Sequence, residues 1–232
     1  MKRFNFLLLA AIALLASCND DKNDPPIVVD KGYPVYVHSY IGTYLKCDNW
    51  ETKTWYNADT DEYYLQIEPK WGDAVKYYID PLRSKKECPE FETIAARNGD
   101  TTYDREVIYF PYPGFELEVC ADNYKSVSVV CPDGDWDEQH PANTSLNDLV
   151  KIEYETYACF VDGKYSEDAL EFEHPTKLLT RLGENDLRMI QPSLKLYIKA
   201  PATEGLELKI TLTTVDGEEQ AVEFNAPRNL PK

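Results

Sequence analysis

Apolar and polar side chains alternate along several short segments of the chain after Tyr33. The pattern is clearest in residues 206–213, where leucine or isoleucine occupies every second position and charged or hydroxyl side chains occupy the others. A period of two is typical of a strand with one face in the core and one in water. Asp216 and Gly217 then give a turn signal before a second run at 219–224, so this segment predicts a β-hairpin.

The same alternation recurs in six other segments: 51–56, 62–68, 115–119, 127–129, 151–160 and 194–199. We expect the first two to form a hairpin around residues 57–61, because that connection is short and rich in turn-forming side chains. We expect the next two to form a second hairpin, which turns near Asp122 and Asn123.

Helical patterns are few. Pro89 suits a first helical position, glutamates follow in the first turn, and Gly99 stands just beyond the last turn, so residues 89–98 predict a short helix. Ser145 followed by Asp148 predicts at most one further turn of helix.

Many short strands and little helix predict an all-β fold, because parallel sheets need long helical crossovers that this sequence lacks. We expect an antiparallel β-sandwich of the immunoglobulin-like kind over residues 33–232, with one or two short helices. The polar segment 132–147 is long for a connection, so it marks either a domain seam or a functional loop.

The first 17 residues predict a secretory signal peptide. Lys2 and Arg3 precede an apolar run over residues 4–16, which is too short to cross a bilayer as a permanent helix. Residues 18–32 contain two adjacent prolines and show no periodicity, so we expect a flexible tether between the leader and the folded domain.

The end of the leader resembles the lipobox of bacterial lipoproteins, which here comprises Leu15, Ala16, Ser17 and Cys18. The resemblance implies that Cys18 carries a diacylglycerol, becomes the new N-terminus and anchors the protein to outer-membrane lipid through acyl chains such as palmitate. The alternative is an ordinary signal peptide in which this cysteine occurs by chance.

Two further stretches resemble Bacteroidetes-type surface lipoproteins. The acidic tract at 19–24 is similar to their export signal, which implies exposure at the cell surface; the alternative is a merely soluble tether. Residues 135–148 are similar to an uncharacterised family of unknown function, which implies fold and location but no active residues. Asp100, Thr101 and Thr102 also resemble the short O-glycosylation motif of those bacteria.

Composition excludes some ligands. The formal charge is −17, whereas binding of nucleic acid or of an anionic membrane surface needs a lysine and arginine footprint. The 10 glycines leave little material for phosphate-binding loops. We therefore expect no nucleic-acid partner.

Catalytic motifs are also missing from the sequence. His38, His140 and His174 are scattered, and none belongs to a zinc-protease motif. No Gly-x-Ser-x-Gly elbow occurs either. We therefore expect a protein that is not an enzyme.

Five cysteines remain beyond the lipidated one, an odd number for an oxidising compartment. By strand alternation Cys120 and Cys159 face outward, whereas Cys131 continues an apolar face. We expect two disulfides, Cys47–Cys88 and Cys120–Cys159, and a buried free thiol at Cys131.

The acidic turn at 133–138 is a candidate calcium site. Asp133, Asp135 and Asp137 offer carboxylates at alternate positions, as an oxygen-lined calcium loop does. The turn lacks the glycine and the final glutamate of the EF-hand pattern, so the alternative is a solvated loop without any cofactor.

Aromatic residues cluster between positions 50 and 78. Adjacent Tyr63 and Tyr64 must face opposite sides of their strand, so at least one lies away from the core. Flat rings beside carboxylates suit sugar recognition, and the candidate ligand-binding residues are Trp50, Trp55 and Trp71. The alternative is that these rings fill the core.

We therefore expect a surface-anchored lipoprotein that acts as a non-enzymatic binding or adhesion module, for a glycan or a surface protein. The alternative is a structural or fimbria-like assembly subunit, which a β-rich anchored chain would also suit.

Overall fold

The computed structural model describes residues 32–78, 88–109, 117–166, 175–201 and 205–224. The predicted signal peptide, Cys18 and nearly all of the tether lie outside these residues. The described residues from Gly32 onward group into one compact unit by their contacts. In the described part, no helix is long and apolar enough to cross a membrane.

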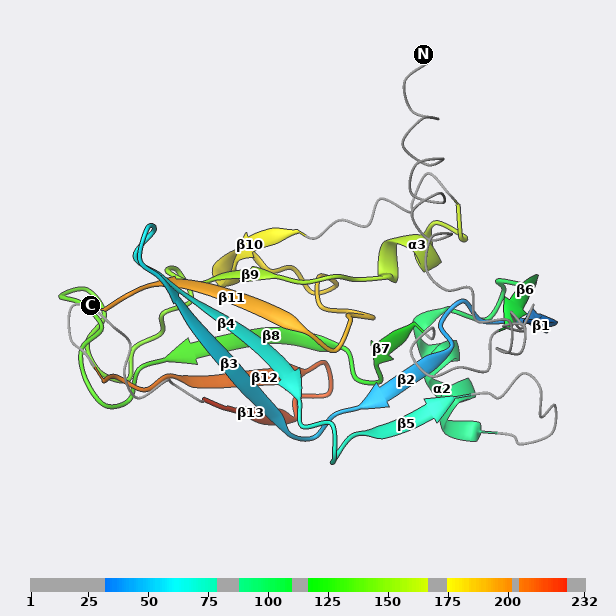
Figure 1. The fold of residues 1–232 in the computed structure, drawn as a ribbon, viewed down its shortest axis with the longest axis horizontal. Helices are drawn as coiled ribbons and strands as arrows, with labels where there is room; N and C mark the ends of the chain where they lie inside the picture. Colours follow the sequence, from blue (N-terminus) through cyan, green and yellow to red (C-terminus); the bar gives the residue numbers. More distant parts are fainter. Residues whose placement is uncertain (1–31, 79–87, 110–116, 167–174, 202–204, 225–232) are drawn as a thin grey trace, which may run out of the picture. The chain divides into compact units, whose positions relative to one another are not determined.

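The described elements are mostly short strands (Figure 1). The strands are β1 (Tyr33–Val37), β2 (Thr43–Lys46), β3 (Trp50–Asn57), β4 (Glu62–Pro69), β5 (Val75–Tyr78), β6 (Arg105–Tyr109), β7 (Glu118–Cys120), β8 (Tyr124–Val130), β9 (Lys151–Glu153), β10 (Thr176–Leu178), β11 (Leu194–Lys199), β12 (Lys209–Thr214) and β13 (Glu219–Glu223). The helices are α2 (Pro89–Asn98), α3 (Ala158–Asp162) and the 3₁₀ turn η2 (Leu179–Arg181).

The strands form three sheets. The largest has eight strands in the order β10-β9-β11-β4-β3-β13-β12-β8, a second has the order β5-β2-β7, and β1 pairs with β6 alone. Most of the described elements are strands and most strand pairs are antiparallel. The prediction of an all-β fold with few helices is therefore confirmed. Two pairs are parallel, β13 with β3 and β2 with β7, which the alternation pattern did not predict.

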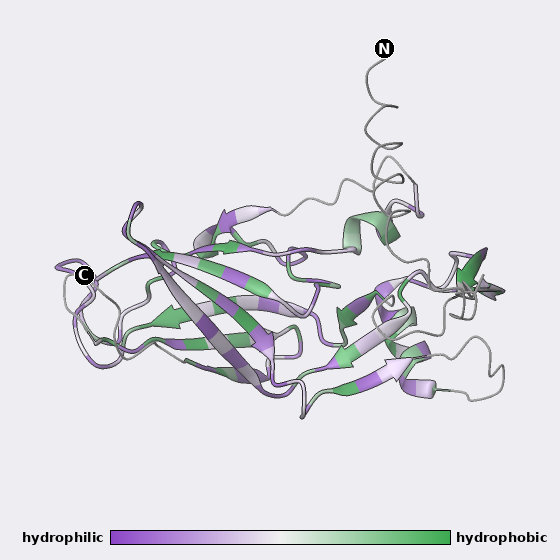
Figure 2. Cartoon of the chain, in the orientation of Figure 1, coloured by the Kyte–Doolittle hydropathy of each residue, from purple (hydrophilic) through white to green (hydrophobic). Residues whose placement is uncertain are grey.

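The eight-stranded sheet curls around a core and does not form the two clearly stacked layers of the expected immunoglobulin-like sandwich. In Figure 1 β3 and β4 cross in front of β8 and β12, although all four belong to one sheet. Leu65 of β4 and Leu212 of β12 belong to the same buried cluster. Hydrophobic and hydrophilic positions alternate along the strands of Figure 2, as this one-sided burial requires.

The three-stranded sheet separates two hydrophobic cores. Leu45 of β2 and Cys120 of β7 face the core of the large sheet. Their chain neighbours Tyr44 and Val119 face a second core, which Phe91 of α2 also enters. One short sheet thus has two largely buried faces, and of the side chains of β2 and β7 only Lys46 and Glu118 are partly exposed.

The hairpins predicted from residues 51–56 with 62–68 and from residues 206–213 with 219–224 are confirmed as β3–β4 and β12–β13. The predicted hairpin around Asp122 and Asn123 is wrong, because β7 pairs with β2 whereas β8 pairs with β12. The turn therefore carries the chain from one sheet into the other.

The helix predicted over 89–98 is confirmed as α2, and Gly99 ends it in the left-handed region with φ of 76°. The expected strand at 151–160 stops at Glu153, and residues 158–162 form α3. No helix forms at Ser145, which makes an isolated β-bridge with Val130.

The long segment 132–147 packs into the domain. Trp136, His140 and Leu146 are buried. The amide of Asn147 accepts a hydrogen bond from the backbone N–H of Val129 at 2.9 Å and donates one to the carbonyl of Val127 at 3.2 Å. This segment therefore covers the outer edge of β8, where an unpaired strand would otherwise be exposed.

Candidate functional site

The outer face of the large sheet carries a row of aromatic side chains across neighbouring strands. Trp55 of β3 stands opposite Tyr64 of β4, and Tyr64 stands opposite Tyr197 of β11. Lys151 of β9 is opposite Tyr197 and continues the row. Since directly paired residues point to the same face, these four side chains project together.

The three rings contact one another. The ring centroids of Trp55 and Tyr64 are 5.0 Å apart with planes inclined by 33°, and those of Tyr64 and Tyr197 are 5.4 Å apart at 45°. Trp55 keeps 45% of its surface exposed, and the two tyrosines are half-buried. The row of these three rings, which we call the aromatic row, spans about 10 Å from β3 to β11 at the usual strand spacing.

A second row of hydrogen-bonding side chains runs beside the first. Lys53, Gln66, Lys195 and Glu153 occupy successive paired positions on β3, β4, β11 and β9. The register places this polar row two residues along each strand from the aromatic row. Lysine and amide donors and a carboxylate acceptor therefore stand alongside the three tilted rings.

Glu153 fixes the end of both rows. Its carboxylate accepts hydrogen bonds from the Tyr197 hydroxyl and from the Lys195 ammonium, each at 2.7 Å. Burial, and then the neighbouring Glu153, raise the pKa of Tyr197 above its ordinary value. The phenol therefore remains a protonated donor, and its hydrogen bond to Glu153 holds the ring in place.

The outer face is electrically balanced. All charged side chains of β3, β4, β9 and β11 lie on it: Lys53, Lys151, Lys195 and Lys199 against Glu51, Glu62, Glu68 and Glu153. Within a chain of formal charge −17, this face repels neither neutral nor acidic ligands strongly.

Of the three candidate tryptophans, only Trp55 belongs to this arrangement. Trp50 is 1% exposed and donates its indole N–H to Gln220 at 2.9 Å, so its predicted ligand-binding role is wrong. Its position at the start of β3 faces the core, five residues from Trp55 and hence on the opposite side. Trp71 is 50% exposed but lies in the turn after β4, apart from the aromatic row.

Tyr64 confirms the expectation that one tyrosine of the adjacent pair faces away from the core, and Tyr63 packs against the core. Sequence reasoning missed Tyr197. Its alternation with Leu196 and Ile198 predicts a position on the polar face of the strand, but only the pairing of β11 with β4 brings it to Tyr64.

The proposed calcium ligands do not come together. In the described part of the chain, no group of three or more His, Cys, Asp or Glu side chains is placed to hold a metal. Asp135 instead accepts the backbone N–H of Ala142 at 2.9 Å. Asp137 accepts the backbone N–H groups of Gln139 and His140, so these carboxylates shape the loop. Asp133 does not join Asp135 and Asp137 in a group that could hold a metal.

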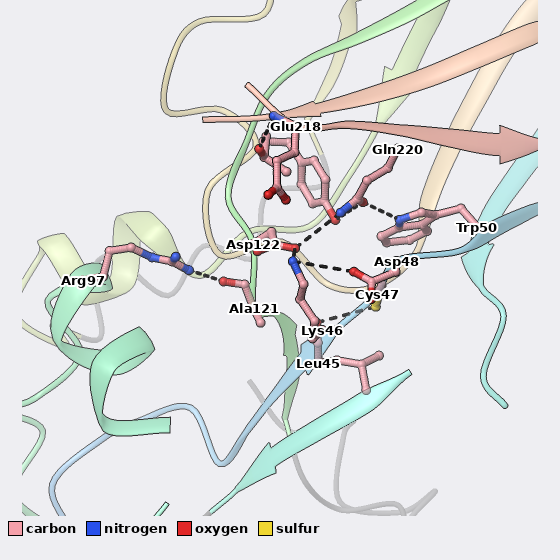
Figure 3. Close-up of polar contacts among 12 residues, drawn as sticks. Leu45, Lys46, Cys47, Asp48, Trp50, Arg97, Ala121, Asp122, Glu218 and Gln220 are labelled. Atoms are coloured by element: carbon pink, nitrogen blue, oxygen red, sulfur yellow. Dashed lines mark hydrogen bonds and ion pairs between the residues drawn. The ribbon is translucent and has the colours of Figure 1, made fainter. Parts of the chain in front are cut away.

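A polar cluster lies where β2, the end of β7 and α2 meet (Figure 3). Asp122 accepts hydrogen bonds from Lys46 at 2.8 Å and from Gln220 at 3.4 Å, and Arg97 donates to the carbonyl of Ala121. A depression of about 430 Å³ opens beside these residues. The cations that line it already have protein partners, so the cluster serves to join helix and sheets.

The predicted disulfides are not formed, and the five cysteines of the described chain have free thiols. Cys47 and Cys120 are buried in the core of the large sheet, whereas Cys88 packs against the second core. Cys159 is exposed on α3, which replaces the strand that the pairing assumed. Cys131 is buried and free, as expected.

One of the three residues that resemble an O-glycosylation motif, Asp100, is buried. Asp100 is fully buried and accepts backbone hydrogen bonds from Tyr40 and Ile41, whereas Thr101 and Thr102 are exposed.

Comparison with known proteins identifies no relative. No family model matches the chain, and no match is found among curated proteins or solved structures.

Proposed function

We propose that this protein is a non-enzymatic carbohydrate-binding lipoprotein of the outer-membrane surface. The aromatic row of Trp55, Tyr64 and Tyr197 is the observation that carries the proposal. The resemblance of residues 15–18 to a lipobox supports lipid anchoring at Cys18.

Sugar rings need two kinds of contact. Their C–H faces pack on flat aromatic surfaces, and their hydroxyl groups exchange hydrogen bonds with carboxylates, amides and ammonium groups. The aromatic row supplies the first and the polar row the second, at adjacent register positions on the same face.

The rows run across the strands, so we expect an extended oligosaccharide to lie across β3, β4 and β11 and not along one strand. Glu153 already holds Tyr197 and Lys195, so little side-chain freedom would be lost on binding.

Replacement of Trp55 by alanine tests the binding proposal. We expect the Trp55→Ala variant to lose at least about tenfold in affinity for a glycan retained by the wild-type protein on a glycan array, or about 1.4 kcal/mol. Trp71→Ala is the matched control, because Trp71 is as exposed but lies off the row. Equal loss in both variants, or no loss in Trp55→Ala, contradicts the proposal.

Metabolic labelling with palmitate tests the anchor. Label should enter the wild-type chain and be absent from a Cys18→Ala variant. Incorporation that is the same in both would exclude Cys18 as the acylated residue.

A further inference from the structure

Positive and negative side chains are segregated on the outer face of the large sheet, although the face as a whole is balanced. β9 and β11 place three lysines and one glutamate on it, an excess of two positive charges. β3 and β4 place one lysine and three glutamates on it, an excess of two negative charges. The strands follow one another in the order β9-β11-β4-β3 (Figure 1), so the aromatic row runs from a negative end at Trp55 to a positive end at Tyr197.

Two of the three lysines at the positive end are not neutralised by ion pairs. Lys195 is held by Glu153 at 2.7 Å. Lys151 and Lys199 are exposed, and neither forms an ion pair with any residue that the structure describes. Lys199 stands opposite Glu62 in the register, however, which offsets part of its charge. Lys151 is therefore the least neutralised of the lysines beside the aromatic row.

The neighbours of Lys151 leave its ammonium group available to a ligand. Tyr197 on β11 and Leu178 on β10 stand directly opposite it, and neither side chain carries a negative charge. Glu153, two residues along the same strand, already accepts hydrogen bonds from Tyr197 and Lys195. Paired side chains on neighbouring strands have Cβ atoms about 5 Å apart, so a sugar packed on the Tyr197 ring brings its substituents within reach of Lys151.

We propose that the saccharide bound at the aromatic row is acidic, and that Lys151 binds the carboxylate or sulfate group of the sugar unit on Tyr197. This proposal rests on the carbohydrate-binding function proposed above and names the class of sugar. The excess of glutamates on β3 and β4 disfavours a second acidic group near Trp55, so the acidic unit lies toward β9.

The net charge of the protein does not oppose this assignment. Charges on an exposed surface are largely screened beyond about 8 Å at physiological ionic strength. The groups that act on an anion at Tyr197 are therefore the local ones, and on β9 and β11 these are mostly lysines. A nucleic acid, by contrast, needs cations along its whole backbone, which this face does not supply.

A glycan array of matched pairs tests the proposal. Each pair has one sugar backbone, in a form that carries a uronic acid or sulfate group and in an uncharged form that lacks it. We expect the full wild-type chain to bind the acidic member about fivefold more tightly, which is the upper end for an exposed ion pair. Carboxylate pairs and sulfate pairs are scored separately, so the array also shows which anion is bound.

Two variants assign the preference to one lysine. Lys151→Gln should bind both members of a pair equally, with the affinity that the wild type has for the uncharged member. Lys209→Gln is the matched control, because Lys209 is also an exposed lysine in a strand and its loss changes the net charge equally, but it lies on β12. The control should keep the preference for the acidic member.

Equal binding of both members by the wild type, or a preference that Lys151→Gln retains, overturns this proposal. If both members bind equally and Trp55→Ala weakens the binding of each, carbohydrate binding at the aromatic row stands without the acidic assignment. Retention of no glycan of either class contradicts both proposals.

Discussion

His140 is held between two carboxylates. Its Nδ1 contacts Asp137 at 2.7 Å and its Nε2 contacts Asp148 at 3.2 Å, with the ring nearly buried. Hydrogen bonding to Asp137 is the largest influence and raises the pKa of His140, whereas the same contact lowers the pKa of Asp137. The protonated imidazole therefore stabilises the folded loop.

The sign of the pH dependence follows from these directions. A raised folded-state pKa means that the stabilisation from His140 is complete below its unfolded value, about 6.5, and is lost as pH rises through the folded value. We expect the free energy of unfolding to decline as the pH rises above about 6.5 in the wild type and to change less in His140→Gln. Urea unfolding at a series of pH values measures this, and identical slopes would exclude His140 as the titrating group.

Trp50 and Trp55 show what residue-level patterns can and cannot predict. Alternation alone places them on opposite faces of one strand, but it does not say which face is buried. The burial of Trp50 depends on Gln220, which accepts its indole N–H from a strand 170 positions away in sequence. A hydrogen-bond partner this distant in sequence cannot be predicted from the local alternation of apolar and polar residues.

At the scale of elements, the hairpins formed by neighbouring strands were predictable, because each depends on a short turn between two alternating runs. The connection from β7 to β8 has the same pattern but joins two sheets. The two strands do not pair with each other because β7 pairs with β2 and β8 pairs with β12. Similarly, the alternating run predicted as a strand over 151–160 ends in residues that form α3.

Asn147 is an element-scale determinant of stability. Its side chain makes two hydrogen bonds to the backbone of β8, in the places that a neighbouring strand would occupy. We expect Asn147→Ala to lower the free energy of unfolding by roughly 1–3 kcal/mol, since it leaves buried backbone groups unpaired.

Hydrogen exchange reports this edge directly. The amide of Val129 should exchange faster in Asn147→Ala than in the wild type, whereas amides of the β3–β4 hairpin should change little. Unchanged protection of Val129 would show that the Asn147 amide does not cover this edge.

At the scale of the whole described domain, the aromatic row depends on the strand order. Trp55 and Tyr64 come from one hairpin and were within reach of sequence reasoning. Tyr197 and Glu153 come from distant segments, and only the order β9-β11-β4-β3 brings them together. The aromatic face was therefore predictable in kind, as exposed rings beside carboxylates, but not in extent.

The indole N–H signals of the four tryptophans, measured by NMR, test most directly whether a saccharide stacks on Trp55 as proposed. On addition of a glycan that the protein retains, the Trp55 signal should shift, while the signal of buried Trp50, bonded to Gln220, should not. The Trp71 signal should also remain in place. A shift at Trp71 with Trp55 unmoved, or no indole shift at saturating glycan, would contradict the account.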